Sequence, residues 1–329
     1  TPHVAGALTL LAELNPTWSY SQLINQVLAT VDPLPALMGK TRSGGRLNAS
    51  AALIPPVIDS PGSGIDLRIL TAEPDGFTSM SVTYEIVGAA LSPFEIGFYR
   101  SADATFAGDS LLGAFLIDAP GGGSIGTHTK TFTIGSSAAQ LFLPGTVVTE
   151  TDTEYHILAV VDRRQSIAED DADSFNEDNT AVMTGVYHLP AGPVFVHGTP
   201  ADDSVSVSAS IDLNVNGEIY SYTSADVASF RIRSRGGNDT IGASGVAKSL
   251  RVWSGDGNDS VTGGSANDTI DGGTGTDRLV ESADVSFTLT NTTLTGAGTD
   301  SITNIEQASL TGGAGNNTIN ASTFGGVVT

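Results

Sequence analysis

The sequence predicts a mainly β protein with three parts: a short helical segment, an antiparallel β-sandwich and a parallel β-solenoid. Three observations support this prediction. Apolar residues recur with helical spacing near the N-terminus, and they alternate with polar residues over short runs in the middle of the chain. Toward the C-terminus, short Thr/Ser/Val/Ile runs alternate with Gly-Asn-Asp turns. The 329 residues suffice for about two or three domains.

The composition excludes several classes of function. A net charge of −22 argues against nucleic-acid binding and against anionic membrane surfaces, and it suits cation binding. The absence of cysteine excludes disulfides and thiolate zinc sites. No apolar run approaches the roughly 18 residues of a membrane helix, so no membrane span is predicted.

Residues 1–54 are predicted to be helical. One apolar stripe with i, i+3, i+4, i+7 spacing is formed by Val4, Ala7, Leu8 and Leu11. Asn15-Pro16 ends this helix, and a second short helix stops near Asp32-Pro33.

Two motifs in this segment carry a family resemblance. The run TPHVAGALT at residues 1–9 resembles the stretch just after the nucleophile of subtilisin-like (peptidase S8) serine proteases. The glycine turn and short helix at 44–53 resemble the end of that catalytic domain. The resemblance implies that the nucleophilic serine lies three residues before Thr1, with the other triad members further upstream. No catalytic residue is therefore assigned, and this chain should be inactive as a hydrolase.

The middle of the chain is predicted to be a sandwich. Residues 55–65 form a Pro/Gly/Ser linker. Over 66–188, alternating runs such as 80–86 predict about seven strands in an antiparallel sandwich. Five short segments resemble CARDB-type adhesion modules, an Ig-like family of bacterial surface proteins: 82–87, 97–101, 160–162, 167–169 and 179–181. This resemblance implies a cell-surface or matrix ligand.

An acidic run at 169–178 leaves two interpretations open. Its carboxylate and amide oxygens suit a second calcium site, although the spacing of an EF-hand loop is missing. The alternative is a solvated acidic loop before the last strand of the sandwich.

Residues 194–329 contain internal repeats. Asp259, Asp268 and Asp277 are spaced nine apart, within the frames 254–262, 263–271 and 272–280. A further copy at 235–241 contains Asp239. Glycines permit the tight turns, and aspartates supply hard oxygen ligands, of which calcium takes about 6–8. The residue two places after each aspartate is apolar and is expected to lie in the core.

The repeats resemble the G-G-x-G-x-D-x-U-x nonapeptide of RTX, or hemolysin-type, calcium-binding proteins. The resemblance implies calcium binding by a set of nine residues: Asp239, Gly255, Gly257, Asp259, Gly264, Asp268, Gly273, Gly275 and Asp277.

Loops 18 residues apart are predicted to stack on one edge of the solenoid. Asp259 and Asp277 would then lie one strand spacing apart, about 4.8 Å, where a divalent cation relieves their repulsion. The pattern also departs from the repeat, because Ala266 replaces a loop glycine and Asn317 replaces an aspartate. We therefore expect one or two good sites. The alternative is a metal-free solenoid whose aspartates cap turns.

These resemblances together predict an extracellular protein, either secreted or held at the cell surface. The chain would be the non-catalytic C-terminal part of a secreted subtilisin-like serine endopeptidase, with calcium bound to its repeats and protein substrates bound by the missing catalytic domain. The alternative is a calcium-dependent adhesion or surface-display module with no protease role.

Overall fold

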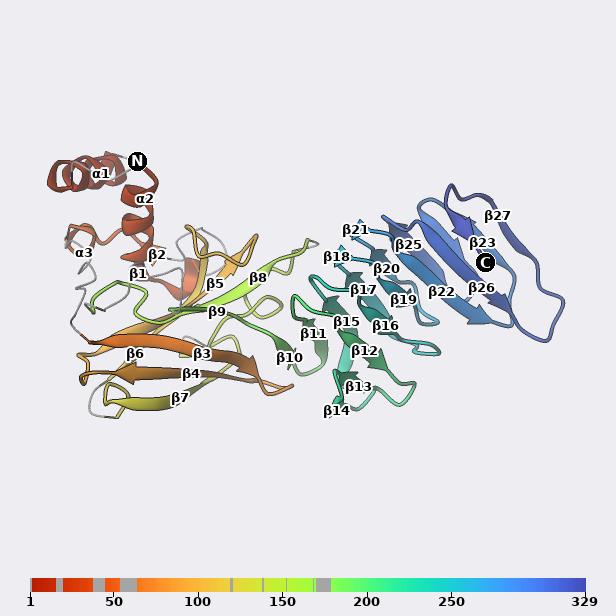
Figure 1. Cartoon of the computed structure of the whole chain (residues 1–329), viewed down its shortest axis with the longest axis horizontal. Helices are drawn as coiled ribbons and strands as arrows, with labels where there is room; N and C mark the ends of the chain where they lie inside the picture. Colours follow the sequence, from red (N-terminus) through yellow and green to blue (C-terminus); the bar gives the residue numbers. More distant parts are fainter. Residues whose placement is uncertain are drawn as a thin grey trace. The chain divides into compact units, whose positions relative to one another are not determined.

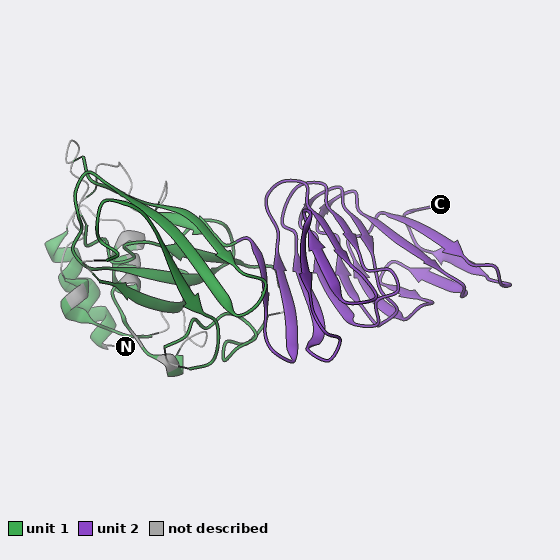
Figure 2. Ribbon diagram, turned by 90° about the horizontal axis from the view of Figure 1, so that it is seen from below, with its two compact units in different colours: residues 1–183 green, residues 184–329 purple. Residues whose placement is uncertain are grey.

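The computed structural model describes residues 2–15, 20–37, 45–53, 64–118, 121–137, 139–151, 153–167, 169 and 179–329. The chain divides into two units, Thr1–Met183 and Thr184–Thr329 (Figure 2). The described residues are mainly β, as predicted.

Among the described residues, helices occur only within the first 53, in the segment predicted to be helical. The elements are α1 (Pro2–Leu14), α2 (Tyr20–Ala29), β1 (Asp32–Pro33), η1 (Pro35–Leu37), β2 (Gly45–Arg46) and α3 (Ala49–Ala52). Leu11 packs with Leu23, Val27 and Ala52 in a small apolar cluster. Asn15 follows the last residue of α1, and its backbone and side-chain N–H groups both donate to the Leu11 carbonyl. Thr1, Gly44, Ile54 and residues 55–63 of the predicted linker lie outside the described residues.

The rest of the first unit forms two antiparallel sheets. Its strands are β3 (Asp66–Pro74), β4 (Ser79–Val87), β5 (Phe94–Ser101), β6 (Ser110–Ile117), β7 (Gly126–Thr133), β8 (His156–Val160) and β9 (Thr180–Val182). One sheet has the order β3-β4-β7 and the other has the order β6-β5-β8-β9. Aromatic pairs join the two sheets, with ring centroids 5.6 Å apart for Tyr84–Phe94 and 5.1 Å apart for Phe98–Phe132. The alternating sequence therefore buries one face of each sheet against the other.

The second unit contains two larger sheets between which the chain passes repeatedly (Figure 1). The first repeat sheet contains β10 (Gly185–His188), β11 (Gly192–His197), β15 (Val227–Arg233), β17 (Ser249–Trp253), β20 (Thr269–Asp271), β23 (Phe287–Thr290), β24 (Thr293–Thr295), β25 (Thr299–Thr303) and β27 (Ile319–Thr323).

The second repeat sheet contains β12 (Ser204–Val207), β13 (Asp212–Val215), β14 (Glu218–Ser221), β16 (Thr240–Gly242), β19 (Ser260–Thr262), β22 (Arg278–Ala283), β26 (Gln307–Gly312) and β28 (Val327–Val328). A small third sheet pairs β18 (Asp256–Gly257) with β21 (Thr274–Gly275).

Parallel pairing dominates both repeat sheets. The run β11-β15-β17-β20-β25 is parallel in the first sheet, and β12-β16-β19-β22-β26-β28 is parallel in the second. Val261, Ile270 and Leu279, the predicted core positions, are buried in the shared apolar core. This arrangement is consistent with a β-roll, in which each pass through both sheets stacks on the previous one.

Candidate metal centre

Four six-residue loops stack on one edge of the repeat sheets, here called edge A: loop 198–203 and the three loops described next, which share one backbone conformation. Each loop leaves a strand of the first repeat sheet and enters a strand of the second; the three are 234–239, 254–259 and 272–277. The strands β18 and β21 are the parallel contact between the second and third of these (Figure 1). A bridge between Gly236 and Asp256 extends the stack to the first of them. The loops therefore lie in register along edge A.

In these three loops, residues with positive φ alternate with residues with negative φ. Positions two and four of each loop have positive φ: Arg235 (79°), Gly237 (108°), Gly255 (98°), Gly257 (137°), Gly273 (85°) and Gly275 (132°). At Gly257 and Gly275 the angle lies in a region that essentially only glycine adopts. The four predicted loop glycines thus shape edge A.

Close stacking is a second requirement for glycine. A Cβ at Gly257 would collide with the carbonyl oxygen of Gly237, and a Cβ at Gly275 would collide with that of Gly257. Each loop therefore lies directly on the backbone of the loop before it.

Acidic side chains form a ladder along edge A. The backbone N–H of Asp239 donates to Oδ1 of Asp259 at 2.7 Å, and that of Asp259 donates to Oδ1 of Asp277 at 2.8 Å. The ladder extends in both directions, since Asp203 N donates to Asp239 Oδ1 and Asp277 N donates to Glu306 Oε2. Backbone amides thus hold one oxygen of each carboxylate in place.

The second oxygens of the three central aspartates have no such partner. Oδ2 of Asp239, Asp259 and Asp277 is buried and has no hydrogen-bond partner among the described residues, although the Ser234 hydroxyl lies near enough to lower the pKa of Asp239. These side chains are only 1%, 2% and 0% exposed. A buried carboxylate oxygen without a donor is costly, so this row of oxygens requires a cation or a proton.

The electrostatics of the ladder support the same interpretation. Burial raises the pKa of Asp239 and of Asp259 to about 6, and the neighbouring aspartates add to both shifts. Burial also raises the pKa of Asp277, to which Glu306 contributes. A cation between the loops would remove the repulsion between these groups and favour their ionised forms.

The available donors are all hard oxygens. Within the described ranges, no three His, Asp or Glu side chains converge as a metal site. A metal on edge A would therefore combine one free aspartate oxygen from each of two adjacent loops with backbone carbonyls of those loops. Oxygen ligands of this kind suit hard cations such as calcium better than zinc or softer metals.

The remaining predicted residues, Gly264 and Asp268, lie elsewhere. They belong to loop 263–268, which leads from the second repeat sheet back to the first and so lies on the opposite edge, here called edge B. The structure thus brings seven of the nine predicted residues together on edge A and separates these two from them.

Asparagines that precede the aspartates form another ladder that was not predicted. Asn258 N donates to Asn238 Oδ1 at 3.0 Å, and Thr276 N donates to Asn258 Oδ1 at 2.9 Å. The repeated Asn-Asp pair at 238–239 and 258–259 is the signal that could have revealed it. Glu306 was also missed, because it lies 29 residues beyond Asp277 and outside any nine-residue frame.

The acidic run 169–178 is described only at Glu169. That carboxylate is buried and accepts hydrogen bonds from the Leu67 N–H and from Asn179 Nδ2. In the described residues, Glu169 therefore ties two segments of the first unit together.

Comparison with known proteins identifies the repeat. Residues 251–280 and 309–323 match the family model described as RTX calcium-binding nonapeptide repeat (4 copies). RTX nonapeptide repeats bind calcium ions, and calcium is the cofactor of this chain. Neither a curated protein nor a solved structure matches the chain.

Among the described residues, no helix has the length and hydropathy needed to cross a membrane.

Substitution of a loop glycine should disrupt edge A. We expect Gly257→Ala to weaken calcium binding at least tenfold and to lower thermal stability, because alanine disfavours φ near 137° and its Cβ meets the Gly237 carbonyl. Gly242→Ala is the matched control, since a Cβ there meets nothing within 4 Å. Isothermal titration with calcium distinguishes the two variants, and equal affinities would contradict the assignment of the loop.

Protons should compete with calcium on edge A. Asp259 has a folded-state pKa of about 6, above its unfolded value of about 3.9. Its contribution to the stability of the calcium-free chain is therefore present below about pH 4 and is lost as the pH rises through about 6. Calcium needs the ionised carboxylates, so its affinity should fall by up to about tenfold per pH unit and per displaced proton below pH 6.

Urea unfolding with chelator at pH 5 and pH 7.5, and calcium titration at the same two values, measure both trends. Asp259→Asn should flatten them. A calcium affinity that is equal at pH 5 and pH 7.5 in the unsubstituted chain would contradict this account.

Proposed function

We propose that the second unit is a calcium-stabilised β-roll that is ordered in an extracellular, calcium-rich compartment. One observation carries the proposal: the row of buried, unpartnered Oδ2 atoms on Asp239, Asp259 and Asp277. Burying these ionised groups opposes folding, and calcium bound between the loops reverses that effect. Binding energy at such a site becomes folding energy. The folded unit would then be less populated in the calcium-poor interior of a cell and more populated in the calcium-rich medium outside it.

We further propose that the chain is the non-catalytic C-terminal part of a secreted subtilisin-like serine endopeptidase. The support is in the sequence: the TPHVAGALT run at 1–9 and the glycine turn at 44–53, in the order in which the protease family has them. The nucleophile, base and orienting aspartate would lie upstream of Thr1, and protein substrates would bind there. The family match at 251–280 and 309–323 does not bear on this part of the proposal.

The second candidate is a calcium-dependent adhesion or display module with no protease role. The CARDB-type resemblance within 82–181 favours it, together with the two antiparallel sheets of that region. A cell-surface or matrix ligand would then be the partner. The coding sequence upstream of Thr1 distinguishes the two candidates, because only the first requires a catalytic domain there.

A calcium titration tests the β-roll proposal. We expect calcium to raise the melting temperature of the chain and to increase its far-UV β signal, with reversal by a chelator. Asp259→Asn should weaken this response at least tenfold, because it removes a ladder carboxylate. Asp256→Asn removes the same charge from the same loop, but its carboxylate is exposed and accepts from Thr274 Oγ1, so this control should respond like the unsubstituted chain. An equal response from both variants would count against the ladder.

A proteolysis assay tests the role in a protease. The chain should hydrolyse no casein, because every member of the triad is assigned upstream. Addition of a serine-directed inhibitor is the control for contaminating enzymes. Inhibitor-sensitive turnover that copurifies with the chain would refute the non-catalytic assignment.

A further inference from the structure

We propose that calcium binds along edge A only, with one ion in each of the two intervals between loops 234–239, 254–259 and 272–277, and that edge B holds none. This inference rests on the calcium binding proposed above and adds its position and stoichiometry. It departs from the nonapeptide pattern, in which the copy at 263–271 would be a calcium repeat like its neighbours.

The backbone of loop 263–268 differs from that of these three edge A loops. Position four of each of the three has φ of 108° to 137° and is glycine. In the edge B loop this position is Ala266, and neither Ala266 nor Gly264 has positive φ. The Cβ of alanine disfavours the conformation that the three loops share. Loop 263–268 therefore does not repeat that conformation.

Each oxygen of the Asp268 carboxylate accepts a backbone hydrogen bond. Its Oδ1 accepts from Leu250 N at 2.7 Å, and its Oδ2 accepts from Gly264 N at 2.8 Å. The corresponding Oδ2 of Asp259 and Asp277 is unpartnered. Asp268 thus lacks the free oxygen that defines the edge A site.

A further carboxylate occupies the space beside Asp268. Glu281 is 5% exposed, and its Oε1 accepts from Gly263 N at 2.8 Å. A Cβ at Gly263 would lie 2.8 Å from this oxygen and 2.9 Å from Asp268 Oδ2. Asp300 closes the group, since its Oδ1 accepts from Asp268 N at 2.9 Å. Backbone amides therefore hold one oxygen of Glu281 and one of Asp300. Burial, with repulsion among these acids, raises the pKa of Glu281 to about 7 and that of Asp300 to about 6, so that protonation relieves the repulsion on edge B.

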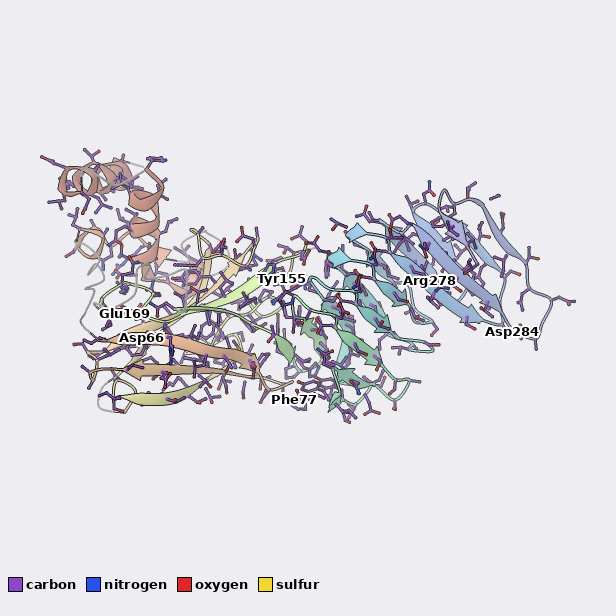
Figure 3. The ribbon with its side chains drawn as sticks, in the orientation of Figure 1. Asp66, Phe77, Tyr155, Glu169, Arg278 and Asp284 are labelled. Carbon is purple, nitrogen blue, oxygen red and sulfur yellow. The ribbon has the colours of Figure 1, made fainter. Side chains whose placement is uncertain are left out.

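The second matched segment, 309–323, does not provide a metal loop either. Asn317 replaces the aspartate, and its Nδ2 donates to Asp284 Oδ1 at 2.8 Å. The Asn317 amide N–H, at the position of the repeat aspartate, would repel a cation. Asp284 lies at the opposite end of β22 from Arg278, which follows the edge A ladder (Figure 3).

The two ends of the edge A stack set the number of intervals. On one side, Asp203 already accepts from Thr199 N and Asn216 Nδ2, and its loop 198–203 has no positive φ. On the other side, only residues 304–306 connect β25 to β26, so no six-residue loop faces Asp277. Three complete loops remain, and they enclose two intervals.

Native mass spectrometry of the full chain in calcium, with a chelated reference, tests the count. We expect two tightly bound ions. Asp277→Asn, at the end of the stack, should lose one ion, and Asp259→Asn, shared by both intervals, should lose both. Asp268→Asn and Glu281→Gln on edge B should each retain two.

Circular dichroism shows whether each variant folds. Glu281→Gln keeps the acceptor for Gly263 N, so its calcium count tests edge B even if Asp268→Asn does not fold. Three or more tightly bound ions in the unsubstituted chain, or loss of an ion in Glu281→Gln, would overturn the inference while leaving calcium binding intact. Binding of no calcium by the unsubstituted chain would instead overturn the proposed function, and the count with it.

Discussion

Parallel stacking of acidic side chains one strand apart is the constraint on which the second unit depends. The apolar core requires that successive passes of the chain remain in register, because Val261 and Leu279 pair across adjacent strands of the second repeat sheet. The same register places Asp259 on Asp277 at edge A. Core packing thus places like charges next to each other, and the loops must offset the repulsion between them.

The two edges differ in how the repulsion between their carboxylates can be offset. On edge A, backbone amides hold one oxygen of each central aspartate, and the other oxygen is left to a cation. On edge B, backbone amides satisfy both oxygens of Asp268. The difference originates in the backbone, since glycines at position four allow three of the edge A loops to take a conformation that Ala266 disfavours. The presence of Ala266 in place of glycine at position four therefore accompanies the difference in hydrogen bonding between the two edges.

Calcium binding of this kind links folding to location. An acidic chain with a net charge of −22 repels itself, and the ladder concentrates that repulsion within a buried row. The helical segment and the sandwich contain no comparable row among their described residues; there, Glu169 is satisfied by Leu67 N and Asn179 Nδ2. The unpartnered acidic row on which the proposed calcium dependence rests thus lies in the second unit.

The sequence by itself predicted the mainly β class, the helices within residues 2–29, the alternating strands of the first unit and the edge A loops as candidate calcium ligands. Those features follow from local spacing: period two for strands, period 3.6 for helices, and nine residues between aspartates. Only the tertiary structure decided that Asp268 differs from Asp259 and that Glu281 and Glu306 join the acidic rows. An antiparallel hairpin, β23–β24, interrupts the nine-residue frame after β22, so later partners depend on the strand register beyond it. Backbone hydrogen bonding between strands sets that register, and it brings together side chains that no local pattern relates.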